Sequence, residues 1–217
     1  EHGNGITRLL KALRHETADI GDTRARLNVK DGTDAIVQVV KTIQTSHAGK
    51  LSIARVLAGK ITDGATLTTA DGAVGRVSGL YALGVRDMAK IAQAGAGATV
   101  GLGKVEPAVT GSTLSTAKAP PKAVVTLTPP KPVISLVVAP KEAKDDVKLS
   151  SSLARLAEED PTLIIIQDAE MAETRIQGQG EMHLRVHLER LLARYGVIVQ
   201  TREPAIPYKE TIQGQVS

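Results

Sequence analysis

The sequence contains no cysteine, phenylalanine or tryptophan, and its three tyrosines are Tyr81, Tyr195 and Tyr208. The absence of cysteine excludes disulfides and thiolate metal sites, which fits a reducing, cytoplasmic setting. Nucleic-acid surfaces that stack bases rely on aromatic platforms, so we expect any RNA contact to be made to phosphates. No hydrophobic run approaches the roughly 20 residues that span a bilayer, so we expect no membrane partner.

The net charge of +4 is unevenly distributed along the chain. Residues 19–114 carry 11 basic and 8 acidic side chains, whereas residues 132–204 carry 9 basic and 12 acidic ones. The stretch 115–131 adds three lysines and no acid. A basic half and connector beside an acidic half suggest a partly polyanionic partner, although +4 is also an ordinary charge for a protein surface.

The first part of the chain changes from a helical pattern to a strand pattern. Residues 4–17 place four aliphatic side chains on one helical face, and we interpret residues 1–18 as the last helix of a preceding domain. From residue 34 onward, short β-branched runs alternate with turns at His47-Ala48-Gly49, Asp63-Gly64 and Asp71-Gly72. Short strands at this spacing predict a closed antiparallel β-barrel over residues 19–114.

A proline-rich stretch separates the barrel from a second pattern. Five prolines lie between Pro120 and Pro132, so residues 115–131 are predicted to form a stiff, extended connector. Residues 132–204 then read as β-α-β-β-α-β, the ferredoxin-like pattern. The expected fold is therefore multi-domain, β followed by α+β, and residues 205–217 begin a further junction.

The most specific segment is IQGQGEMHLRVHLERLL, residues 176–192. It predicts a strand, a Gly-x-Gly turn at 178–180, and a helix from Glu181 to Tyr195. A phosphate-binding turn needs free backbone N–H groups at the positive end of the helix dipole. Here Glu181 places a carboxylate at that end, where it is itself stabilised and would repel an anion. We therefore expect the turn to place side chains against a partner.

The predicted helix carries an apolar stripe and a polar, basic one. Leu184, Leu188, Leu191, Leu192 and Tyr195 are expected to pack in the core. The basic stripe consists of His183, His187, Arg190 and Arg194.

His183 and His187 have the i, i+4 spacing of a zinc-binding pair. The glutamate of HExxH is absent, however, and no third ligand is evident, so we expect no metal site. The basic stripe then has two interpretations, a solvated face or a docking surface.

No nucleotide-binding or catalytic motif is present. Gly-x4-Gly-Lys-[Ser/Thr] does not occur, and Gly178-x-Gly180 and Gly101-x-Gly103 lack a third glycine. No Ser/His/Asp or paired-carboxylate arrangement stands out among the 23 acidic residues. We therefore expect no cofactor and no catalysis in this segment by itself.

Three motifs nevertheless resemble a known family. LARLAEEDPTL, GQGEMHLRVHLERLLARYGV and REPAIPYKETI make residues 132–212 similar to domain III of bacterial elongation factor G and its junction with domain IV. Residues 34–114, with HAGKLSIARVLAGKITDGATL, resemble the barrel domain II of translational GTPases. The opening GNGITRLLKALRHE resembles the last helix of their GTPase domain. The segment GQGEMHLRVHLERL differs from the family's commoner form, GMGELHLDIIVDRM. Because of this difference, the chain resembles the elongation factor G-like paralogues more closely.

The resemblance implies that the parent protein is a ribosomal translocase that hydrolyses GTP. GTP and Mg²⁺ would be bound by the parent protein and not by this fragment. The expected partners are the ribosome, with its small-subunit RNA and protein, and the GTPase domain and domains IV and V of the same parent. The fragment itself is expected to be monomeric and cytoplasmic.

The resemblance also assigns roles to individual residues. A switch-region role would fall on Gly178, Gly180, Glu181, His183 and Leu184, near the fusidic-acid pocket. RNA contacts would fall on Lys50, Arg55 and Arg76. Arg185 replaces the family's usual acid, which leaves switch contacts and drug binding open. The alternative function is a ribosome-binding module of a paralogue that regulates or protects the ribosome without translocation.

Overall fold

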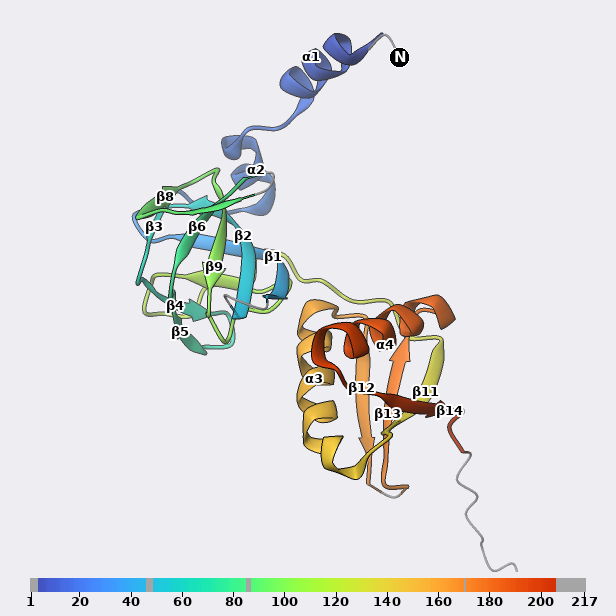
Figure 1. The fold of residues 1–217 in the computed structure, drawn as a ribbon. Coiled ribbons are helices and arrows are strands. Elements are labelled where there is room, and N and C mark those ends of the chain that lie inside the picture. The colour runs from blue at the N-terminus through green and yellow to red at the C-terminus, as the bar shows by residue number, and fades with distance from the viewer. Residues whose placement is uncertain (1–3, 46–48, 85–86, 170, 206–217) are drawn as a thin grey trace, which may run out of the picture. The chain divides into compact units, whose positions relative to one another are not determined.

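The structure is a computed structural model, and it describes residues 4–45, 49–84, 87–169 and 171–205. The chain divides into two compact units, Glu1–Leu127 and Thr128–Ser217 (Figure 1). The division falls inside the predicted connector 115–131. Most of the predicted junction 205–217, from residue 206 onward, lies outside the described residues.

The first unit opens with two helices, α1 (Ile6–Glu16) and α2 (Ile20–Leu27). Helix α1 confirms the predicted amphipathic segment, and its apolar side chains Ile6, Leu9, Leu10 and Leu13 are each at least half exposed. Helix α2, which packs against β2, was not predicted. It is short, and its start depends on a capping box between Asp19 and Asp22 more than on hydrophobic periodicity.

In the described part of the first unit, ten strands of three to ten residues build the barrel. Among the described residues, an antiparallel sheet runs in the order β5-β4-β10-β1-β2-β9-β6-β7, and β3 pairs with β8. The strands are β1 (Ile36–Thr45), β2 (Gly49–Ala58), β3 (Lys60–Thr62), β4 (Thr66–Thr69), β5 (Val74–Arg76), β6 (Leu80–Leu83), β7 (Met88–Lys90), β8 (Gln93–Gly95), β9 (Thr99–Gly103) and β10 (Thr113–Ser115).

The barrel core consists of aliphatic side chains, as expected for a sequence without phenylalanine or tryptophan. Val37, Val56, Leu67, Leu102 and Leu114 are all fully buried in it. The predicted hairpin at Asp71-Gly72 is confirmed, because it joins the paired strands β4 and β5. Most of the predicted turn at 47–49 lies outside the described residues.

The connector begins along the barrel wall. The amide of Val124 donates to the Thr113 hydroxyl over 2.9 Å. The side chain of Leu127 lies against Gly111, where an added Cβ would come within 3.0 Å of it. Residues 115–127 are thus held by the barrel, and the extended stretch that remains before β11 is short.

The second unit has the predicted β-α-β-β-α-β order. Its described residues contain four strands, which form an antiparallel sheet in the order β12-β13-β11-β14, the ferredoxin-like arrangement. The elements are β11 (Ile134–Pro140), the 3₁₀ turn η1 (Ala143–Asp145), α3 (Asp146–Glu159), β12 (Ile164–Asp168), β13 (Glu173–Gly178), α4 (Glu181–Tyr195) and β14 (Val199–Arg202).

Helices α3 and α4 cover one face of this sheet. Leu149, Leu153 and Leu156 of α3 pack with Leu184 and Leu191 of α4 over the sheet. The predicted apolar stripe of α4 is wrong at Leu192, which is 53% exposed. The buried stripe instead includes His187, which lies three residues after Leu184 and four before Leu191 and is 1% exposed. No helix in the described part of the chain has the length and apolar character needed to cross a membrane.

Candidate functional site

The Gly-x-Gly turn joins β13 directly to α4. A Cβ added at Gly178 would overlap Nδ1 of His183 and lie 2.7 Å from Cδ2 of Leu184. Gly178 is therefore required by the close approach of the first turn of α4. Gly180 caps the helix with extended backbone that any residue can adopt, and an added Cβ there would meet no described atom within 4 Å.

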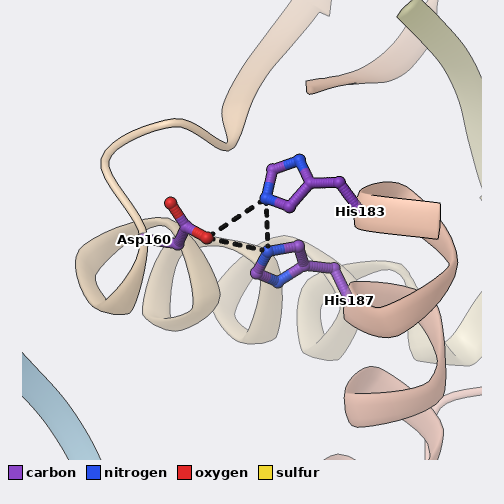
Figure 2. A group of neighbouring side chains, drawn as sticks. All are labelled: Asp160, His183 and His187. Carbon is purple, nitrogen blue, oxygen red and sulfur yellow. Dashed lines mark hydrogen bonds and ion pairs between the residues drawn. The ribbon is translucent and has the colours of Figure 1, made fainter. Parts of the chain in front are cut away.

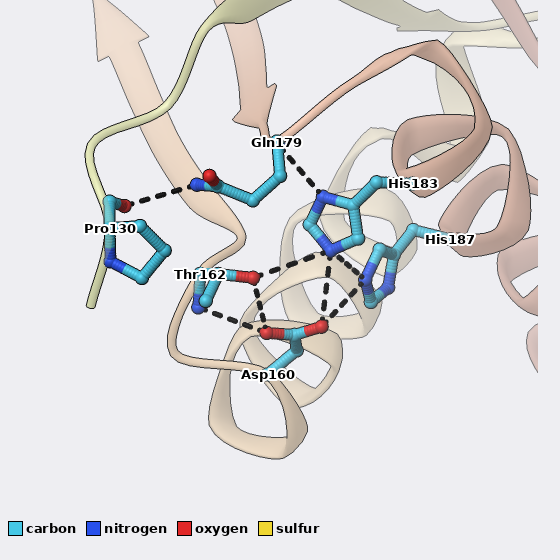
Figure 3. Close-up of polar contacts among 6 residues, drawn as sticks. All are labelled: Pro130, Asp160, Thr162, Gln179, His183 and His187. Carbon is cyan, nitrogen blue, oxygen red and sulfur yellow. Dashed lines mark hydrogen bonds and ion pairs between the residues drawn. The ribbon is translucent and has the colours of Figure 1, made fainter. Parts of the chain in front are cut away.

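Gln179, between the two glycines, ties the turn to its surroundings (Figure 3). Its backbone N–H donates to Nδ1 of His183 over 3.1 Å. Its side-chain amide donates to the carbonyl of Pro130 over 3.0 Å. The Gln179 backbone amide is thus engaged by a side chain, which supports the interpretation that the turn does not hold phosphate.

The predicted partner-facing residues fall into two groups. Glu181 is exposed and His183 is half-buried, so both can reach a partner. Leu184 is fully buried in the core and Gly178 is buried beneath α4, so neither faces a partner. The prediction of a partner-facing role is wrong for these two residues; they hold the turn in place.

His183 meets two other side chains that have metal-binding chemistry (Figure 2). Its Nε2 lies 3.1 Å from Oδ2 of Asp160 and 3.1 Å from Nε2 of His187. The third side of this triangle, from His187 Nε2 to Asp160 Oδ2, is 3.3 Å. No third candidate ligand is evident from the sequence beside the histidine pair, and the structure places one there, the carboxylate of Asp160 at the C-cap of α3.

The tautomer of His183 follows from its hydrogen bonds. In a neutral imidazole one nitrogen donates and the other accepts. Because Nδ1 accepts from Gln179, the proton lies on Nε2, facing the triangle. Nδ1 of His187 is buried, and no described residue is within hydrogen-bonding reach of it.

The charge state of this cluster is set by burial and by Thr162. Burial alone would raise the pKa of the Asp160 carboxyl. Hydrogen bonds from the Thr162 hydroxyl and amide and from the two imidazoles outweigh burial and hold that pKa well below its usual range. Burial lowers the pKa of His187, and His183 lowers it further, against an opposing contact with Asp160. The resting cluster is a carboxylate beside a neutral His187.

The predicted basic docking stripe is wrong as a continuous surface. His187 lies on the buried face of α4, which it shares with Leu184 and Leu191. Arg194 makes two hydrogen bonds of 2.9 Å to the buried carboxylate of Glu159 on α3. Arg190 is half-buried. Three of the four stripe residues, His183, His187 and Arg194, therefore contact α3 or the Asp160 that caps its end.

The predicted RNA contacts in the barrel also divide. Lys50 is 5% exposed, and its ammonium donates to the carbonyl of Glu106 over 2.6 Å. Lys50 is therefore a structural residue, and its prediction as an RNA contact is wrong. Arg55 and Arg76 are exposed, and each makes a hydrogen bond of 3.0 Å within the barrel.

Two residues near these sites were missed from the sequence. Asp160 lies 23 positions before His183, so no local spacing connects them. Lys90 lines the same surface hollow as Arg76 and Asp63, and pairs with Asp63 over 3.0 Å. Lys90 lies in residues 81–93, which match no motif of the family. The only signal in the sequence that could have pointed to it was its positive charge.

Comparison with known proteins gives consistent matches. The sequence model of the family "Elongation Factor G, domain III" matches residues 129–203. An elongation factor G-like protein of Synechocystis sp. is 41% identical over 98% of this chain. An elongation factor G 1 of Syntrophus aciditrophicus is 32% identical over 96% of it. A crystal structure from Thermus thermophilus matches 94% of the chain with a TM-score of 0.77 at 28% identity.

The chain spans 31% and 30% of the two relatives and 30% of the solved chain. The matched region covers both the barrel and the ferredoxin-like unit. By sequence and by fold, the chain belongs to the elongation factor G family, with residues 129–203 as its domain III.

Proposed function

We propose that this chain is the central part of a ribosomal translocation GTPase of the elongation factor G type. The barrel docks on small-subunit ribosomal RNA and on the GTPase domain of the same protein. The ferredoxin-like domain relays the nucleotide state from the GTPase domain toward domains IV and V. GTP and Mg²⁺ are held outside residues 1–217, in a cytoplasmic parent, and the fragment itself is monomeric.

The attachment of the Gly-x-Gly turn carries the relay proposal. Gly178 packs against His183 and Leu184, and Gln179 is bonded both to His183 and to Pro130. A displacement of the exposed Glu181 or the half-buried His183 by a contacting domain therefore also moves α4 and the segment before β11. A surface that moves as one body with a helix is suited to report the state of a neighbouring domain.

The RNA-docking proposal is supported by the exposed guanidinium groups of Arg55 and Arg76 and by the basic balance of residues 19–114. Both side chains are oriented by a hydrogen bond to the barrel, so less conformational entropy is lost on binding a phosphate. Phosphate contacts of this kind weaken as salt concentration rises.

A second candidate function is that of an elongation factor G-like protein that occupies the ribosome for regulation or protection without translocation. The identity of 41% to an elongation factor G-like protein, against 32% to an elongation factor G 1, favours this candidate.

The full-length protein distinguishes the two functions in one pair of assays, ribosome-stimulated GTP hydrolysis and toeprinting of messenger movement. Stimulated hydrolysis with movement supports the translocase. Stimulated hydrolysis or binding without movement supports the paralogue function. A protein that neither binds ribosomes nor responds to them contradicts both.

A further inference from the structure

We propose that Asp160, His183 and His187 form a binding site for a divalent cation of the zinc class. The three donor atoms are Oδ2 of Asp160 and Nε2 of each histidine, and they are separated by 3.1, 3.1 and 3.3 Å (Figure 2). They come from the end of α3 and from two successive turns of α4. The proposal does not depend on the ribosomal function.

These separations match those of ligands around one ion. Zinc binds imidazole nitrogen and carboxylate oxygen at about 2.0–2.1 Å in tetrahedral sites, which places neighbouring ligand atoms about 3.3–3.4 Å apart. The triangle is slightly smaller than this. A cation seated just off its plane would reach all three atoms with side-chain shifts of a few tenths of an ångström. Imidazole with carboxylate also suits zinc better than calcium or magnesium, which prefer oxygen ligands.

Hydrogen bonds alone do not satisfy the triangle. Two neutral imidazoles bring two protons at most to its three sides. If both Nε2–H groups donate to Asp160, the two nitrogens still face each other at 3.1 Å with no acceptor between them. One cation instead uses a lone pair from each of the three atoms.

Thr162 prepares Asp160 to act as a ligand (Figure 3). Its hydroxyl and its amide donate to Oδ1 of Asp160 over 2.7 and 3.0 Å. These bonds engage one carboxylate oxygen and turn the other, Oδ2, toward the histidines. Partners of this kind, which orient a ligand from outside, are a regular feature of protein metal sites.

Solvent can reach the site from one side. The side chains of His183 and Asp160 are 21% and 25% exposed, whereas that of His187 is 2% exposed. A cation can therefore enter past His183 and Asp160, and a fourth coordination position toward solvent remains for water. Three protein ligands with an open fourth position are typical of zinc sites that exchange a ligand.

Cation binding changes the Gly-x-Gly turn. Ligation through Nε2 requires the His183 proton to move through solvent from Nε2 to Nδ1. The protonated Nδ1 can no longer accept from the Gln179 amide, so the 3.1 Å hydrogen bond between them is lost. The cation and this contact exclude each other, which lowers the affinity and couples occupancy of the site to the turn.

The test is calorimetric titration of Zn²⁺ into the tag-free 217-residue chain. We expect one saturable equivalent per chain, and affinity at least about tenfold weaker for His183→Gln and for Asp160→Asn. The control is His15→Ala, because His15 is exposed on α1 and lies in the other unit. Its affinity should equal that of the wild type.

Two results would overturn the proposal: no saturable Zn²⁺ equivalent in the wild type, or a His183→Gln variant that binds as tightly as the wild type. His183 is half-buried at the surface, so this variant decides the question even if Asp160→Asn does not fold. A ¹⁵N spectrum provides a second measurement, in which Zn²⁺ should shift the Gln179 amide in the wild type and leave it unshifted in His183→Gln.

Discussion

Gly178 and His183 lie in such close contact that no side chain can be added at position 178 without moving the imidazole. The Gly-x-Gly turn and the first turn of α4 are therefore one packed body. A sequence search for phosphate loops treats both glycines alike, whereas the structure requires only the first of them for packing.

Gly178→Ala should destabilise the chain by about 1–3 kcal/mol, the usual effect of overpacking a closed contact. Gly180→Ala is the matched control, and should change the free energy of unfolding by less than about 1 kcal/mol, because its Cβ would meet no described atom within 4 Å. Urea denaturation followed by circular dichroism measures both. Equal losses in the two variants would contradict the packing account.

Arg194→Ala should destabilise the chain by about 1–3 kcal/mol, because it removes two charge-assisted hydrogen bonds from the buried carboxylate of Glu159. The control is Arg185→Ala, which removes only an exposed pair with Glu189 on the same helix. Exposed pairs contribute about 0.2–1 kcal/mol, so the control should unfold close to the wild-type midpoint. Similar midpoints for both variants would mean that Arg194 does not hold α4 to α3.

Arg55→Ala and Arg76→Ala, made in the full-length protein, should each weaken ribosome binding and reduce its dependence on salt. Each removed phosphate contact lowers the slope of log affinity against log salt by about one unit or somewhat less. Lys50→Met should instead lower barrel stability and leave that slope unchanged, because the Lys50 ammonium is buried against Glu106. An Arg55 variant with the wild-type salt slope would remove Arg55 from the RNA surface.

Tyr195 should make stability fall at high pH. Burial raises the pKa of its phenol, and Glu159 raises it further. Because the phenol ionises at lower pH in the unfolded chain, at about 10, stability is lost as pH rises past that value. Urea midpoints at pH 9 and 11 should fall less in Tyr195→Phe than in the wild type. Parallel falls would show that Tyr195 does not titrate differently on folding.

The element order of the second unit was predictable because its periodicity is strong and local. The predicted helix from Glu181 to Tyr195 has the same bounds in the structure, and Leu149, Leu153 and Leu156 are buried as their spacing indicates. Each of these features depends on side chains within a few turns of one another.

The chemistry of the site was less predictable. The spacing of Leu184, His187 and Leu191 does place the histidine on the buried face, so this signal was available in the sequence. It was outweighed because His187 also belongs to the basic stripe. The contact with Asp160 is different, because it depends on how α3 and α4 pack and not on any local spacing.

The relay through the Gly-x-Gly turn is tested most directly by the ratio of GTP hydrolysis with and without ribosomes in the full-length protein carrying Glu181→Gln. Glu189→Gln, also exposed on α4, is the control. We predict that Glu181→Gln lowers the ratio about tenfold, within the usual range of coupling between sites, with GTP binding unchanged. The control should keep the wild-type ratio. A wild-type ratio in Glu181→Gln would contradict the account.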